Sequence, residues 1–159
     1  MTTARPGARR RLTPSGAGLS PNRVPPSLAD TLRQHGIQPS AQRLAVAEYV
    51  LCTVAHPSAD QVFAEVRARL PMISRATVYN TLNLFVRKEL LKPLVLAEGR
   101  VVFDPHLAPH HHFVDEATGA IHDVPWDALD VRRVERLKGL EVREYQVVLR
   151  GRKLRGRGP

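Results

Sequence analysis

The chain has very little cysteine and no long apolar segment. Cys52 is the only cysteine among 159 residues, which excludes a disulfide within the chain and a zinc site built from cysteines of one chain. No apolar run approaches the length of a membrane span, and the first residues lack the apolar core of a signal peptide. We therefore expect a cytoplasmic protein with no membrane partner.

Acidic residues are missing from both ends of the chain. Residues 1–26 contain five arginines and residues 150–159 contain five basic residues, and neither segment contains Asp or Glu. The first segment is also rich in Pro, Gly and Ser, which predicts a disordered basic tail. We expect both basic tails to attract nucleic-acid phosphates, the alternative being a solubilising role.

Two segments of opposite charge lie between the tails. Residues 27–103 contain nine basic and six acidic residues, a net charge of +3. Residues 104–149 contain five basic and nine acidic residues, a net charge of −4. A chain of this length has room for one mid-sized or two small domains, and we expect the two segments to form separate domains.

Serine precedes each of four segments with helical periodicity. Serine is a preferred helix N-cap, and Gln61, three residues after Ser58, adds the signature of a capping box. The predicted helices end near Gly36, Cys52, Leu70 and Lys88, and their N-caps are Ser27, Ser40, Ser58 and Ser74. Short helices joined by tight turns resemble a helix-turn-helix arrangement.

The fourth predicted helix has one apolar and one polar face. At 100° per residue, Val78, Leu82 and Phe85 share a narrow sector that we expect in the core. The opposite side offers a cation, an aromatic ring and two amides, which can read base edges and phosphates in a major groove. These residues are Arg75, Tyr79, Asn80 and Asn83. The alternative is an ordinary amphipathic helix with a solvated polar face.

The residues after this helix read mainly as strands. Residues 94–96 and 101–103 predict a hairpin with a glycine turn, and a hairpin after a recognition helix makes a wing on which Arg100 can contact phosphate. Further along, the pattern predicts strands over 112–114, 121–124 and 142–149 and a helix over 126–138. The predicted class is α+β: a winged helix-turn-helix domain, then a small α/β module that pairs with a second copy because it buries little core alone.

Three consecutive histidines, His110 to His112, lie between Asp104 and Asp123. Imidazole and carboxylate are ligands for borderline and hard divalent metals. In a strand, His110 and His112 point to one face and His111 to the other. The pattern predicts a metal site, the alternative being a solvated loop or core histidines with one hydrogen bond each.

Five segments in order resemble the ferric uptake regulator family of metal-dependent repressors. The resemblance covers about 27–149, and its segments are 36–43, 55–60, 74–82, 103–104 and 110–112. It implies a winged-helix domain, an α/β dimerisation domain, and repression by a homodimer bound to a palindromic double-stranded DNA operator. Arg43, which ends the first segment, joins the implied DNA contacts.

The same resemblance implies a regulatory metal site at the junction of the two domains. Its ligands fall on His56, Asp104, His110, His112 and Asp123. A metal that bridges the domains sets their orientation, and with it the separation of the two recognition helices in a dimer.

One departure from the family concerns structural zinc. Many members hold zinc with two Cys-x-x-Cys pairs, whereas here the first pair falls on Asp115 and Thr118 and the second is absent. We expect no structural zinc and a dimer that rests on apolar packing by Trp126, Val147 and their neighbours.

The resemblance also suggests the signal. Iron-sensing members usually have glutamate where this chain has Asp104, and aspartate is a feature of the peroxide-sensing branch. That branch implies Fe(II) or Mn(II) as the cofactor and oxidation of His56 or His110 by peroxide with Fe(II) bound.

Other signals and another functional class stay open. The haem-linked iron-response branch shares the histidine run, but its Cys-Pro dipeptide is missing because Thr53 follows Cys52. Iron, zinc or manganese sensing are further alternatives. A His/Asp metalloenzyme, such as a metallo-hydrolase or a non-haem iron oxygenase, needs a general base and a substrate pocket, and the chain has no motif for either. We therefore expect a regulator and no enzyme.

Overall fold

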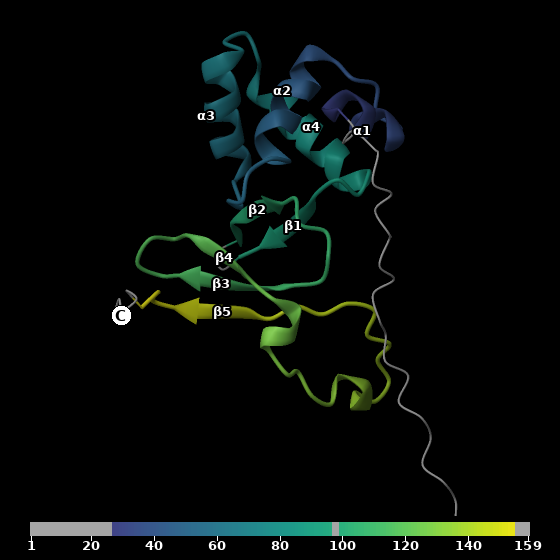
Figure 1. The fold of residues 1–159 in the computed structure, drawn as a ribbon, viewed down its shortest axis with the longest axis vertical. Helices are drawn as coiled ribbons and strands as arrows, with labels where there is room; N and C mark the ends of the chain where they lie inside the picture. The colour runs from purple at the N-terminus through teal and green to yellow at the C-terminus, as the bar shows by residue number, and fades with distance from the viewer. Residues whose placement is uncertain (1–26, 97–98, 155–159) are drawn as a thin grey trace, which may run out of the picture.

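Four helices lie between residues 28 and 87 in the described part of the chain, and Figure 1 shows them packed together. The computed structural model describes residues 27–96 and 99–154, so the predicted disorder of 1–26 lies outside the described residues. The bounds of the helices are α1 Leu28–Gln34, α2 Ala41–Val50, α3 Ala59–Arg69 and α4 Arg75–Arg87. No helix in the described ranges is long and apolar enough to cross a membrane.

Each helix begins at the serine that the sequence indicates. The side chain of each serine accepts a hydrogen bond from the backbone N–H three residues further on. Around α3 the capping box is complete, since the Gln61 side-chain oxygen accepts a hydrogen bond from the backbone N–H of Ser58. Caps of this kind contribute about 1 kcal/mol each, and all four predicted starts are confirmed.

The helices bury one apolar core, and α4 contributes three side chains to it. Val78, Leu82 and Phe85 of α4 have no exposed surface, which confirms the predicted inner face. The predicted polar set of Arg75, Tyr79, Asn80 and Asn83 is exposed.

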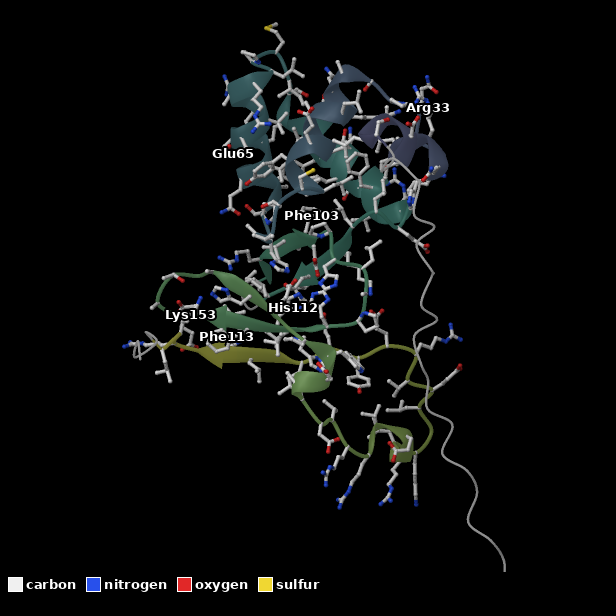
Figure 2. All side chains as sticks on the ribbon, in the orientation of Figure 1. Arg33, Glu65, Phe103, His112, Phe113 and Lys153 are labelled. Atoms are coloured by element: carbon white, nitrogen blue, oxygen red, sulfur yellow. The ribbon has the colours of Figure 1, made fainter. Side chains whose placement is uncertain are left out.

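A two-stranded sheet follows α4 and closes the helical half from below in Figure 1. Strands β1 (Lys92–Val95) and β2 (Val101–Asp104) are antiparallel, so the predicted hairpin is confirmed. The backbone N–H of Phe103 donates to the Pro57 carbonyl over 3.0 Å, and its ring joins the helical core (Figure 2). These contacts hold the segment before α3 beside the end of β2.

The remaining strands form a second sheet. Its order is β4–β3–β5, with β3 (His111–Asp115) antiparallel to β4 (Ile121–Val124) and parallel to β5 (Val148–Gly151). Arg150 and Gly151, assigned to the C-terminal tail in the sequence, belong to β5. The long connection from β4 to β5 lies at the bottom of Figure 1.

The helix expected over 126–138 is wrong. The structure has two 3-10 turns there, η2 (Trp126–Ala128) and η3 (Val134–Arg136), with left-handed Arg133 between them. A short helix is stable only when its apolar face packs on something, and neither turn buries a residue. Trp126 instead stacks on the His111 ring of β3 and lies tilted against the ring of Tyr145, which precedes β5.

The last expected strand is right only at its end. The alternation from Val142 onward predicts a strand over 142–149, but the β-ladder begins at Val148. Residues before it run without strand pairing. The α+β class itself is confirmed by the four helices and two sheets.

Candidate metal centre

The predicted metal ligands meet between the helical half and the three-stranded sheet. His56 precedes α3, Asp104 ends β2, His110 precedes β3, and His112 lies on β3. These four are buried and offer ligand atoms within 4.8 Å of one another. Asp123 of β4 adjoins them, its Oδ1 lying 3.0 Å from His56 Nε2. The structure therefore brings together all five predicted residues.

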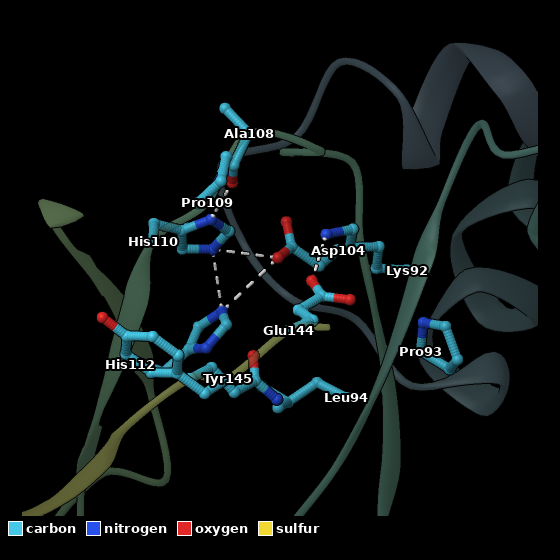
Figure 3. Close-up of a pocket in the computed structure, with 11 residues that line it drawn as sticks. Lys92, Pro93, Leu94, Asp104, Ala108, Pro109, His110, His112, Glu144 and Tyr145 are labelled. Atoms are coloured by element: carbon cyan, nitrogen blue, oxygen red, sulfur yellow. Dashed lines mark hydrogen bonds and ion pairs between the residues drawn. The ribbon is translucent and has the colours of Figure 1, made fainter. Parts of the chain in front are cut away.

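Asp104 is the carboxylate at the centre of this group. Its Oδ2 lies 3.0 Å from His110 Nε2 and 3.4 Å from His112 Nε2 (Figure 3). Its Oδ1 lies 3.7 Å from His56 Nε2. Burial alone raises the pKa of this carboxyl, but the facing imidazoles of His112 and His56 and the hydrogen bond from the His106 backbone N–H outweigh burial and hold the pKa well below its usual range. Asp104 is thus an anion near neutral pH.

The histidine nitrogens point inward as ligands would. His110 Nδ1 lies 2.8 Å from the Ala108 carbonyl, which can only accept, so Nδ1 donates there and Nε2, which faces Asp104 Oδ2, is the atom available to a metal. Such outer contacts orient metal-bound histidines. Both ring nitrogens of His56 have no hydrogen-bond partner among the described residues, although an unpaired buried polar atom costs about 1–3 kcal/mol. The donor set fits a divalent cation.

The strand register explains which histidine faces the site. His112 pairs with Asp123 across β3 and β4, which puts both beside the cluster. His111 points to the other face, where it stacks on Trp126 at 4.6 Å and its Nδ1 accepts a hydrogen bond from the Val147 backbone. The predicted alternation is confirmed, and His111 has a structural place.

One histidine escaped the sequence analysis. His106 Nδ1 lies 3.2 Å from Asp123 Oδ2, and its ring stacks on His110 at 4.4 Å between centroids. Its position two residues after Asp104 and four before His110 is the feature of the sequence that could have identified it as a neighbour of the metal site.

The sequence model of the ferric uptake regulator family matches residues 34–150. The chain belongs to this family. Its members are transcriptional regulators and not enzymes, so the predicted regulator class is confirmed.

Within this family, the chain is similar to several peroxide regulators. The chain is 32% identical over 126 residues to the peroxide operon regulator of Bacillus subtilis (strain 168), covering 77% of this chain and 86% of the relative. It is 34% identical over 107 residues to the peroxide-responsive repressor of Staphylococcus aureus (strain Mu50), covering 67% and 71%. Among solved structures, the Campylobacter jejuni peroxide stress regulator superposes with a TM-score of 0.61 at 25% identity, over 81% of this chain and 98% of that one.

The candidate DNA face of this family member is held by contacts between α3 and α4. Asp60 of α3 forms an ion pair with Arg75 and accepts a hydrogen bond from the Tyr79 hydroxyl at 3.1 Å. The Arg75 guanidinium also lies over the Phe63 ring, 4.8 Å from its centroid. The two predicted side chains are therefore held side by side, and Asp60 was not predicted.

The other predicted DNA residues are more dispersed. Arg43 donates to the Gln38 carbonyl at 2.7 Å and shares a surface hollow with Asn80. Arg100, expected to point from the wing to phosphate, contacts the Gly119 carbonyl at 3.4 Å. The wing therefore touches the β3–β4 turn. Asn83 is exposed on α4.

The positions matching the family's first cysteine pair form a hydrogen-bonded turn. The Asp115 carboxylate accepts from the Ala117 backbone at 3.0 Å and from the Thr118 hydroxyl at 2.9 Å. The hydrogen bond from the Ala117 backbone has the largest effect, and together with the bond from the Thr118 hydroxyl it holds the pKa of Asp115 below its usual range. Local hydrogen bonds thus shape this turn.

Proposed function

We propose that this protein is a homodimeric, metal-dependent repressor that responds to peroxide through its N/O metal centre. The observation that carries the proposal is the meeting of His56 with Asp104, His110, His112 and Asp123, since these residues come from both halves of the chain. The proposal is also supported by the similarity of this chain to the peroxide regulators of Bacillus subtilis and Staphylococcus aureus.

Fe(II) or Mn(II) suits this site. Nitrogen and oxygen donors without sulfur are the ligands of such ions, and a related ferric uptake regulator from Pseudomonas aeruginosa has been solved with manganese. When bound, Fe(II) would activate hydrogen peroxide by lending an electron that the oxidised ring returns, so the iron would act as a catalyst. The net change is the gain of one oxygen atom by a ring carbon of His56 or His110, while the peroxide leaves as water.

The chain's own residues turn this damage into a signal. His56 is the ligand from the helical half, and the other four come from β2 onward. An oxidised ring is a weaker base, so the connection between the halves at His56 or His110 is weakened. The proposed domains, 27–103 and 104–149, are then free to reorient, and the recognition helices lose their spacing on a palindromic double-stranded DNA operator.

A second copy covers the apolar side chains of the dimerisation half in this proposal. The large apolar residues exposed there are Leu107, Trp126, Leu137, Leu140, Val142 and Leu149. A small module gains stability by burying such surface in a dimer. The Asp115 turn takes the place of a zinc clamp, so we propose that no structural zinc is required.

Peptide mapping after peroxide treatment tests the signal. The Fe(II)-loaded protein should gain one oxygen on His56 or His110 and release DNA selected from a random-sequence library by the Mn(II)-loaded protein. The Mn(II) form, given the same dose, is the control and should stay bound. Equal reaction of both forms, or no oxidised histidine, contradicts peroxide sensing and leaves a simple metal sensor as the better interpretation.

A further inference from the structure

A second group of metal-competent side chains lies on the outside of the proposed metal centre. His106, His110 and Asp123 offer ligand atoms within 4.8 Å of one another. His110 also belongs to the buried group of His56, Asp104, His110 and His112, and Asp123 borders that group. We call these the outer group and the inner group.

The two groups differ in their access to water. The side chains of His106 and Asp123 are 51% and 39% exposed, whereas that of His56 is 2% exposed. A hydrated cation cannot reach the inner nitrogens without losing most of its water. The outer group can replace some of that water while solvent still surrounds the ion.

Asp123 connects the groups through its two oxygens. Oδ2 lies 3.2 Å from His106 Nδ1, while Oδ1 lies 3.0 Å from His56 Nε2 and 3.8 Å from His110 Nε2. A carboxylate can hold an ion by either oxygen, so this arrangement lets one ligand stay attached while the others exchange.

His106 is also fixed in place for such a role. Its ring stacks on His110 with an interplanar angle of 11°, and its backbone N–H donates to Asp104 Oδ1 at 2.7 Å. The exposed imidazole is thus tied to two residues of the inner group.

We propose that His106 and Asp123 form a loading site through which the divalent cation enters and leaves the inner group. This rests on the inner group being the metal centre of the proposed function. The ion first exchanges water for His106 and Asp123, then passes to the inner ligands as His106 is released. A ligand used only in transit speeds entry and exit equally and leaves the affinity unchanged.

Stopped-flow mixing with Co(II) tests the loading site, because Co(II) absorbs visible light when bound by nitrogen and oxygen ligands. In His106→Ala, the association and dissociation rates should both fall by about tenfold, the effect of about 1.4 kcal/mol in a barrier. The dissociation constant should stay within about twofold of wild type, and His106→Asp should restore much of both rates.

His122→Ala is the matched control. His122 is next to Asp123 in β4 but lies over Phe113, at 6.4 Å between ring centroids, so both rates should equal those of wild type. Unchanged rates in His106→Ala overturn the loading site. A dissociation constant weakened tenfold at an unchanged association rate also overturns it, because His106 would then be a ligand of the final site. Failure of wild type to bind Co(II) at all is a different result, and it would overturn the proposed metal centre itself.

Discussion

Asp104 shows how one side chain links the fold to the chemistry. Its position at the end of β2 is set by pairing with β1 and by the contact of β2 with the segment before α3. Its carboxylate then meets histidines from both halves of the chain. A change at Asp104 should therefore affect both the signal and stability.

Asp104→Glu should separate metal binding from peroxide sensing. Glutamate keeps the charge and an oxygen donor, so metal-dependent DNA binding should remain. The longer side chain can change how many oxygens bind the ion and close its open position, so histidine oxidation should fall by about tenfold or more. Mass spectrometry at matched Fe(II) occupancy measures this, and a wild-type oxidation rate would contradict it.

Asp104→Asn should change the response of the metal-free protein to acid. The folded pKa of Asp104 is lowered, so the carboxylate stabilises the fold above its unfolded pKa of about 3.9, and this contribution is lost as pH falls towards the lower folded pKa. In urea unfolding, the free energy of unfolding of wild type should exceed that of Asp104→Asn at pH 6. The difference should become smaller below about pH 4. A gap that is constant with pH would show that Asp104 acts only by packing.

At the scale of elements, α4 depends on α3 for the arrangement of its polar face. Asp60 restrains both Arg75 and Tyr79, and exposed pairs of this kind are weak, about 0–1 kcal/mol. A DNA phosphate or base edge can therefore replace Asp60 as the partner of Arg75.

Arg75→Ala and Tyr79→Ala should each weaken operator binding by about 1–3 kcal/mol, the value of a good base or phosphate contact. Fluorescence anisotropy at fixed salt with the selected duplex measures the loss. Co(II) titration is the control and should match wild type, since neither residue lies near the metal centre. Unchanged DNA affinity in both variants would mean that α4 does not enter the groove.

The β3–β4 turn gives a test of the zinc-free dimer. Thr118→Val removes the hydroxyl that donates to Asp115 and should lower the melting temperature by roughly 2–4 °C.

Exhaustive chelation of wild type should remove the regulatory metal but leave the dimer intact by analytical ultracentrifugation. Dissociation after chelation, reversed by zinc alone, would contradict a zinc-free dimer.

For the whole molecule, the proposed metal centre joins two halves whose other polar contacts, among the described residues, lie at the surface. Lys92 of β1 and Glu144 before β5 form an ion pair at 2.6 Å, and Arg100 contacts Gly119. Both are exposed and therefore weak. In the proposed function, the buried ligands are the connection whose strength changes when the metal binds.

Metal loading should raise operator affinity by about 5- to 150-fold, the usual range of allosteric coupling. The comparison is anisotropy of the metal-free and Mn(II)-loaded dimers on the same duplex, with His56→Ala as the variant that loses the ligand from the helical half. Equal affinity of metal-free and Mn(II)-loaded wild type would show that the site does not control DNA binding.

The sequence by itself determined the features that depend on neighbours along the chain. The serine caps act over three residues, the inner face of α4 follows from 100° per residue, and strand alternation separates His111 from His110 and His112. Each of these features follows from the geometry of nearby residues along the chain, so it can be predicted from a single sequence.

Only the tertiary structure decided what depends on contacts between distant segments. The meeting of His106 with Asp123, and of Asp60 with Arg75 and Tyr79, joins residues 15 to 19 positions apart. The absence of a helix over 126–138 has the same origin, because the described residues provide no surface that buries the side chains of its two 3-10 turns. Periodicity states which side of a segment is apolar, but the partner that covers that side comes from the rest of the fold.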